Sequence, residues 1–453
     1  MRVLICDDSA FMRKAIAMLL DNEADIEVIE TARHGEDALE KIKRYTPDIL
    51  TLDLEMPVLD GMGTLTRIKA EISLENRPAI LVCSTLSSKG SHEALKAMRL
   101  GASDVIFKDT AGIGGGSQGI KAELCSKLRA IYESLCRTNP RVRAAATTNT
   151  NANAASKKPK AHASLHAHAI RALDPSPVHL APPVDAAKLI RDLSLRTNPP
   201  ELIVIGSSTG GPPVLEQILS TLPADMPCPI VVAQHMPALF TKSLAERLNE
   251  LCDIEVIHAD AQSTTLKPGC AYVIVGGKHG RVIRSGSSWR IDVSEKPLEA
   301  LYKPSVDELM LSAAQSAGKG VLAVMLTGMG DDGSRGAKAL FDAGATVLTQ
   351  HADSCVVYGM PRAVVQLNAS TAPMNPDAIA KVLVSASPTG VAAIHTNQRD
   401  SFDRFALLKP PASTKNQPNS QPNNQTAANT PPWRNKAPST TPQPSQAPRR
   451  DVA

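Results

Sequence analysis

The chain has 453 residues, enough for about three domains of ~100–200 residues each. Its hydrophobic fraction of 43% and charged fraction of 21% are typical of a globular protein, and its formal net charge of +4 is too small to indicate a nucleic-acid or membrane-surface binder. Apolar runs are shorter than the ~18–20 residues of a membrane span, and the N-terminus has too few apolar residues for a signal peptide. We therefore expect a soluble, cytoplasmic protein that neither binds nucleic acid nor inserts into a membrane.

Composition divides the chain into four parts. Residues 1–137 and 199–388 are densely patterned and predict two folded domains. Residues 138–198 are rich in Ala, Thr, Asn, Pro and His, which predicts a flexible linker. Residues 389–453 are rich in Pro, Gln and Asn, and most of this segment has too few apolar side chains to offset the entropy of ordering. This last part is predicted to be a disordered C-terminal tail.

Five short apolar runs alternate with helical patterns in the first domain: RVLIC (2–6), IEVIE (26–30), DILTLD (48–53), AILVCS (79–84) and DVIF (104–107). Between the first two runs, helical spacing places four apolar side chains on one face: Phe11, Ala15, Met18 and Leu19. A second helical stretch, 92–100, is closed by Gly101. Five strand–helix repeats predict an α/β fold with a doubly wound parallel sheet, which binds ligands beyond the carboxyl ends of its strands.

Polar residues stand at those strand ends. Asp7 and Asp8 follow the first strand and Asp53 ends the third, while Ser84 ends the fourth and Lys108 follows the fifth. Each acid alone could be an ordinary solvated side chain, but all five residues would converge on one rim. Three crowded carboxylates favour a hard cation such as Mg²⁺. A central carboxylate beside a metal, a hydroxyl and an ammonium can accept a phosphoryl group.

Residues 1–125 resemble the receiver domain of two-component response regulators, and the run LDLEMPVLDG (52–61) resembles the loop after the third strand of that family. The resemblance implies that Asp53 is phosphorylated by a histidine kinase as phosphodonor, and that Mg²⁺ is held by Asp7, Asp8 and Asp53. It also implies that Ser84 is the switch hydroxyl and that Lys108 contacts the phosphoryl group. One departure is Asp109, where the family usually has proline.

A glycine-rich turn between a strand and a helix opens the second domain, in ELIVIGSSTGGPP (201–213). A dinucleotide fingerprint fails at Ser208, and a phosphate-binding P-loop fails at Pro212, where lysine is required. The pattern GxSxG fits residues 206–210 and would place Ser208 on a tight turn at a helix N-terminus. A plain Ser/Gly turn is the competing interpretation.

Two more strands of this domain end in residues that could complete a catalytic triad. PIVVAQHMP (229–237) places His235 after an apolar run, and VLAVMLTGMGDDG (321–333) places Asp331 and Asp332 in a glycine turn. A serine needs a neighbouring base to act as a nucleophile, and the imidazole needs a carboxylate. The order Ser…His…Asp disfavours the α/β-hydrolase fold. We expect a second doubly wound parallel sheet that brings these residues to one rim.

This domain resembles the catalytic domain of the CheB family of chemotaxis protein-glutamate methylesterases. The motifs that carry the resemblance are GSSTGG (206–211), QHMP (234–237), KPSVDELM (303–310), TGMGDDG (327–333) and SCVVYGMPRA (354–363). The resemblance implies that Ser208 is the nucleophile, His235 the general base and acid, and Asp332 the orienting carboxylate. It implies an oxyanion hole formed by the backbone N–H groups of Thr209 and Met329.

The family resemblance implies a phosphorylation-activated hydrolase of sensory adaptation in chemotaxis. It would demethylate glutamate methyl esters on the cytoplasmic helices of chemoreceptors, release methanol, and deamidate certain receptor glutamines. The esterase step would need no cofactor, and Mg²⁺ would serve the receiver. The main alternative is a response regulator with a non-enzymatic effector, such as a DNA-output domain, but the sequence has no helix-turn-helix pattern. A nucleotide-binding effector is a second alternative, weakened by the failed glycine motifs.

Overall fold

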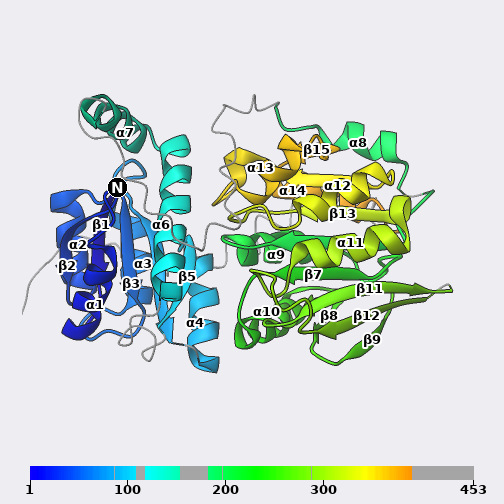
Figure 1. Cartoon of the computed structure of the whole chain (residues 1–453), viewed down its shortest axis with the longest axis horizontal. Helices are drawn as coiled ribbons and strands as arrows, with labels where there is room; N and C mark the ends of the chain where they lie inside the picture. Colours follow the sequence, from blue (N-terminus) through cyan, green and yellow to red (C-terminus); the bar gives the residue numbers. More distant parts are fainter. Residues whose placement is uncertain (86, 109–117, 154–181, 196, 287, 390–453) are drawn as a thin grey trace, which may run out of the picture. The chain divides into compact units, whose positions relative to one another are not determined.

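The computed structural model describes residues 1–85, 87–108, 118–153, 182–195, 197–286 and 288–389 (Figure 1). The expected tail from residue 390 onward, the centre of the expected linker and the loop that begins at Asp109 lie outside these residues. Among the helices of the described residues, none combines the length and the apolar character needed to cross a bilayer.

The N-terminal domain is a five-stranded parallel sheet with the strand order β2-β1-β3-β4-β5. Its strands are β1 (Arg2–Cys6), β2 (Glu27–Ala32), β3 (Ile49–Asp53), β4 (Ala79–Thr85) and β5 (Asp104–Lys108). Its helices are α1 (Ala10–Leu20), α2 (Gly35–Tyr45), α3 (Gly61–Glu71), α4 (Ser88–Arg99) and α6 (Gln118–Thr138). All five predicted strands are present, and the doubly wound order is confirmed.

Helix α1 forms where the apolar spacing predicts it, but it buries a different face. Met12, Ile16 and Leu20 are buried, whereas Phe11 and Met18 are 63% and 64% exposed. Both sets of residues repeat at helical spacing and both are apolar. The sequence pattern therefore gives the helix but cannot choose which of its two apolar faces packs on the sheet.

The C-terminal domain is built on a seven-stranded parallel sheet with the order β15-β14-β13-β6-β7-β10-β8. Its strands are β6 (Leu202–Ser207), β7 (Ile230–Gln234), β8 (Glu255–Ala259), β10 (Cys270–Ile274), β13 (Val321–Met325), β14 (Thr346–Gln350) and β15 (Ala372–Met374). A separate antiparallel sheet, which the sequence patterns do not reveal, contains β9 (Ser263–Leu266), β11 (His279–Ser285) and β12 (Ser288–Ser294).

Helices cover both faces of the seven-stranded sheet (Figure 1). The side chains of Leu202 and Val204 pack with buried residues of α11 (Val306–Ser316), α12 (Ser334–Asp342) and α13 (Met360–Gln366). Those of Ile203 and Ile205 pack with α9 (Gly211–Leu219), α10 (Ala238–Leu251) and α14 (Pro376–Val384). Alternate residues of β6 therefore enter two cores, as in a strand buried on both sides.

The central position of β6 determines where a ligand can bind. This strand pairs with β7 on one side and with β13 on the other, although β13 comes more than a hundred residues later in the chain. The direction of winding therefore reverses at β6, and the helices that follow its two neighbours lie on opposite faces. Such a reversal leaves a crevice at the carboxyl ends of the strands, which is the usual site of function in an open α/β sheet.

The expected flexible linker, residues 138–198, contains two helices, α7 (Pro140–Asn153) and α8 (Ala186–Leu193), so the structure differs from the expectation over these stretches. Near the start of α7, Val142 is buried. In α8, Asp185 caps the N-terminus by accepting a hydrogen bond from the amide of Ala187, and Leu189 is buried. These short apolar patterns are hidden in sequence by the Pro- and Ala-rich residues around them.

Candidate active site

Ser208 lies in the turn between β6 and α9. Its amide donates to the carbonyl of Thr327 at 3.0 Å, and its carbonyl accepts from the amide of Gly211 at 2.8 Å. Gly210 has a φ of +76°, and a Cβ placed on it would lie 2.5 Å from the side chain of Val356. Only glycine fits this turn, so the glycine of the GxSxG pattern is required by the conformation that presents Ser208 at the start of α9.

The two adjacent serines have different environments. Ser207 is fully buried, and its hydroxyl donates to the side-chain oxygen of Gln234 at 2.6 Å. The amide group of Gln234 in turn donates to the carbonyl of Ser208 at 2.9 Å. Ser208 is only partly buried. Of the pair, therefore, Ser208 is the one that a substrate can reach, as the GxSxG position predicts.

His235 follows β7 and is paired with Asp332. The Nε2 atom of His235 lies 2.8 Å from Oδ2 of Asp332, and the two side chains are 7% and 11% exposed. Within the described residues, the buried Nδ1 of His235 has no hydrogen-bond partner. A carboxylate at Nε2 favours the tautomer with its proton on that nitrogen. Nδ1 is then the unprotonated nitrogen, free to accept a proton.

Asp332 is held by the N-terminus of α11. It accepts the hydroxyl of Ser305 at 2.9 Å, the amide of Val306 at 2.7 Å and the amide of Asp307 at 3.1 Å. Burial by itself would raise the pKa of Asp332, but the hydrogen bonds from His235 and from these amides outweigh burial, and the pKa is lowered. Asp332 is therefore ionised at neutral pH.

The other acid of the glycine turn does not share this environment. Asp331 is exposed, whereas Asp332 forms the pair with His235. The sequence alone does not decide which of the two acids is the carboxylate that pairs with His235. The geometry agrees with the choice of Asp332.

The turn after β13 packs directly against Ser208. A Cβ placed on Gly328 would lie 2.8 Å from the Cβ of Ser208 and 2.3 Å from the sulfur of Met360. Met329, the next residue, therefore sits in a turn that adjoins the serine, and Thr209 follows the serine in the chain. Both residues expected to supply oxyanion-hole amides thus come from the segments that adjoin Ser208.

Two side chains of the N-terminal domain contact these same segments. The hydroxyl of Thr209 donates to Oδ2 of Asp104 at 2.6 Å, and the hydroxyl of Ser126 donates to the sulfur of Met329 at 3.2 Å. All four residues belong to one compact unit, Met1–Arg399. The N-terminal domain therefore contacts both residues that are expected to form the oxyanion hole.

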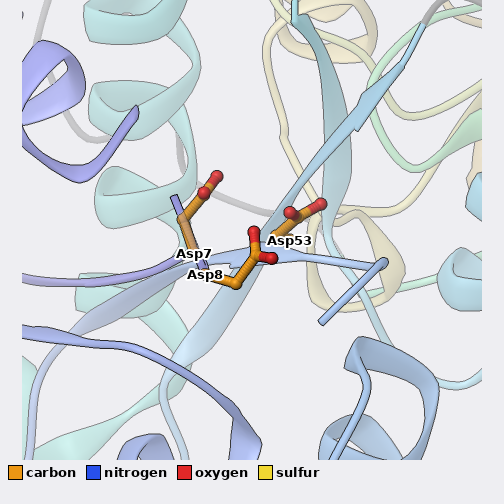
Figure 2. Close-up of side chains that lie close together, drawn as sticks. All are labelled: Asp7, Asp8 and Asp53. Carbon is orange, nitrogen blue, oxygen red and sulfur yellow. The ribbon is translucent and has the colours of Figure 1, made fainter. Parts of the chain in front are cut away.

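The acidic cluster of the first domain is present at the ends of β1 and β3. Asp7, Asp8 and Asp53 lie together (Figure 2), and one oxygen from each lies within 4.8 Å of the others. The Nζ atom of Lys108 lies 2.9 Å from Asp7 and 2.7 Å from Asp53. Ser84 donates to the carbonyl of Gly90 at 3.2 Å, in the first turn of α4.

The charges at this cluster are not balanced. Burial raises the pKa of Asp53, although its bond to Lys108 acts in the opposite direction. Burial would lower the pKa of Lys108, but hydrogen bonds to Asp53 and Asp7 outweigh burial, and the pKa is raised. The ammonium of Lys108 thus pairs with two of the three carboxylates, those of Asp7 and Asp53. This donor set fits a hard divalent cation.

Sequence reasoning misses three side chains that support the site. Gln234 fixes the serine turn, and its signal is a polar residue at the end of a buried strand directly before His235. Ser305 is detectable because it forms a capping pattern, Ser-x-x-Glu, with Glu308. Tyr302, whose ring lies on the imidazole of His235, has no sequence signal.

Known proteins are similar to this chain over both of its domains. Residues 203–383 match the family described as CheB methylesterase, and residues 3–112 match the response regulator receiver domain. The protein-glutamate methylesterase/protein-glutamine glutaminase 1 of Oleidesulfovibrio alaskensis is 40% identical over 392 residues, which cover 85% of this chain and 99% of that protein. Enzyme 2 of the same name from Nitratidesulfovibrio vulgaris is 42% identical over 364 residues, covering 80% of this chain and 93% of that protein.

Among solved structures, the catalytic domain of the Thermotoga maritima CheB methylesterase is similar to this chain, with 36% identity and a TM-score of 0.39. The match covers 41% of this chain and 97% of that domain. Full-length relatives of this identity and coverage establish the family. The chain belongs to the CheB methylesterase family, with a response regulator receiver domain ahead of its methylesterase domain.

Proposed function

We propose that this protein hydrolyses glutamate methyl esters on the cytoplasmic signalling helices of chemoreceptors, with release of methanol, and converts specific receptor glutamines to glutamates. The observation that carries the proposal is the pairing of His235 with the anchored Asp332, at the end of the strand that neighbours the one leading to Ser208. The activity named for its full-length relatives supports the choice of substrate. Receptor helices of this kind lie in the cytoplasm, where the enzyme would act.

The geometry supports an acyl-transfer mechanism in two stages. Oγ of Ser208 attacks the side-chain carbonyl carbon of the substrate while its proton passes to Nδ1 of His235. The negatively charged oxygen of the tetrahedral intermediate accepts hydrogen bonds from the backbone amides of Thr209 and Met329. The proton on His235 then passes to the leaving methoxide oxygen, and methanol departs. Asp332 stays ionised throughout and stabilises the imidazolium.

Water completes the cycle by the reverse proton path. His235 takes a proton from water, whose oxygen attacks the acyl carbon, and the protonated imidazole then returns a proton to Oγ of Ser208. A glutamine side chain has the same acyl carbon with an amine as leaving group, so the same residues would release ammonia. One triad and one oxyanion hole therefore serve both reactions.

We propose that the receiver accepts a phosphoryl group on Asp53 from a histidine kinase. Asp7, Asp8 and Asp53 would hold Mg²⁺, which fits their three carboxylates. The ion supplies positive charge that offsets the charge of the transferred phosphoryl group. Lys108, already paired with Asp53, would contact that group, and Ser84 would act as the switch hydroxyl. The alternative is an effector domain that only binds DNA or another partner. The family matches do not support it.

The proposed activity is tested by methanol release from methylated receptor. The full chain and its Ser208→Ala variant are compared on receptor whose methyl esters carry a radiolabel, and deamidation is followed on the same receptor by mass spectrometry. We expect the wild type to release labelled methanol and the variant to release almost none. Equal release by both proteins would exclude Ser208 as the nucleophile, and no release by either would exclude the substrate.

A further inference from the structure

The ring of Tyr302 lies flat against the imidazole of His235. The two ring centroids are 4.4 Å apart and the ring planes differ by 6°. Asp332 occupies the Nε2 edge of the imidazole, and Nδ1 must stay free to receive the proton of Ser208. A contact on the ring face is therefore the way to hold the plane of the imidazole without blocking either nitrogen.

The segment that carries Tyr302 also holds the carboxylate partner of His235. Three residues after Tyr302, the hydroxyl of Ser305 donates to Asp332 at 2.9 Å. The amide of Ser305 donates to Nδ1 of the fully buried His279 at 3.2 Å, which fixes the segment to the core. One short stretch of chain thus sets both the plane of the imidazole and the position of its carboxylate.

The electronic character of the Tyr302 ring suits a neighbouring cation. Burial, and then the charges of Asp332 and Asp331, raise the pKa of Tyr302, so the phenol is neutral at physiological pH. The face of an aromatic ring carries partial negative charge and attracts a cation placed over it. His235 becomes such a cation when it takes the proton of Ser208. The attraction is then stronger in the transition state than in the resting enzyme, which is the condition for accelerating the reaction.

We propose that Tyr302 is a positioning residue for the general base: its ring fixes the plane of the His235 imidazole and stabilises the protonated form of that imidazole. The inference rests on the proposed function only for the role of His235 as the base that activates Ser208. The phenol hydroxyl has no part in it, because the ring face makes the contact.

The test compares Tyr302→Leu, Tyr302→Met and Tyr302→Phe in the full chain, with Leu301→Ala as the matched control. Leu301 is the neighbouring residue and is 73% exposed. Two quantities are measured: the rate at which a fluorophosphonate probe labels Ser208, and kcat and KM for methanol release. Labelling requires an activated serine but no receptor, so it reports the role of Tyr302 whatever the natural substrate is.

We expect both ring-free variants to lose roughly 2- to 30-fold in labelling rate and kcat, the range of a cation–π contact, with KM nearly unchanged. Tyr302→Phe should restore both rates, and Leu301→Ala should match the wild type. Two results would overturn the proposal: ring-free variants that label at the wild-type rate, or a Tyr302→Phe variant as slow as they are. A wild type that labels at Ser208 yet releases no methanol would count against the proposed substrate, while the labelling rates still decide the role of Tyr302.

Discussion

The reactivity expected of Ser208 depends on residues that are individually ordinary. Its neighbour Ser207 has the same side chain, yet that hydroxyl is committed to Gln234 in the core. His235 gains a defined tautomer from Asp332, and Asp332 gains a defined position from the start of α11. The chemistry expected at this site therefore depends on the hydrogen bonds that each side chain makes, and not on residue type alone.

The two serines are predicted to respond oppositely to removal of the hydroxyl. Ser208→Ala should lower kcat/KM by about 10⁴–10⁶, as loss of a triad nucleophile does. Ser207→Ala should keep most of the activity but unfold more readily by about 1–3 kcal/mol, because the side-chain oxygen of Gln234 loses its buried donor. Methanol release and urea denaturation measure the two effects. An inactive Ser207→Ala with an active Ser208→Ala would show that the turn presents the other serine.

The two acids after β13 allow a matched comparison. Asp332→Asn should lower kcat by roughly 10⁴, because the amide can neither stabilise the imidazolium nor fix the correct tautomer. Asp331→Asn should have little effect, since Asp331 is exposed and His235 is paired with its neighbour. Steady-state rates on methylated receptor check both variants. The reversed ranking would assign the orienting carboxylate to Asp331.

At the scale of elements, helix α11 holds the carboxylate that pairs with His235. Its first amides point at Asp332, where the partial positive charge of a helix N-terminus stabilises a carboxylate. Its side chains Leu309 and Met310 are buried in the core beneath the sheet. The same helix therefore packs in the core and holds Asp332, so no loop lies between the packed core and the carboxylate that pairs with His235.

Helix α8 is predicted to be part of the folded catalytic domain rather than of the linker. Leu189 is buried in the same core as residues of α14, while Lys188 is exposed. Leu189→Ala should lower the free energy of unfolding by about 2 kcal/mol or more, and Lys188→Ala should change it by less than about 0.5 kcal/mol. The midpoint of urea denaturation measures both. If the two variants have the same midpoint, α8 does not contribute to the fold.

At the scale of the whole molecule, the two domains meet at both of their sites. Phe107, next to Lys108 on β5, packs against Phe240 of α10 with ring centroids 4.3 Å apart. Asp104, at the other end of β5, accepts a hydrogen bond from the hydroxyl of Thr209, the residue after Ser208. One strand of the receiver therefore contacts both the acidic cluster and the turn that carries Ser208. A phosphoryl group that draws Lys108 into a new position can loosen these contacts.

Phosphorylation is therefore predicted to raise the activity of the full chain. A small-molecule phosphodonor with Mg²⁺ should increase the rate of methanol release by about 5- to 150-fold, the range that 1–3 kcal/mol of coupling allows. Asp53→Asn should remove this response and leave the basal rate. A fragment of residues 182–389, which keeps α8, should be active without a donor. If that fragment is no faster than the unphosphorylated chain, the receiver does not act by blocking the site.

The sequence by itself determines the two parallel-sheet domains and the family. Strand-length apolar runs and helical spacing predict both parallel sheets, and the polar residues that end the runs predict an acidic cluster in the first domain and a Ser, His and Asp group in the second. This works because parallel strands must bring their carboxyl ends to one edge, so that chain position fixes the place of each side chain. The motifs then distinguish one family from the many that share the fold.

Only the tertiary structure decides between residues or helix faces that the sequence pattern leaves equivalent. It buries the Met12 face of α1 rather than the Phe11 face, commits Ser207 to the core, and selects Asp332 over Asp331. It also places Tyr302 on His235, although 67 positions separate them in the chain. Each of these choices depends on contacts between elements distant in sequence, and a local pattern carries no information about which of two equivalent side chains will meet a distant partner.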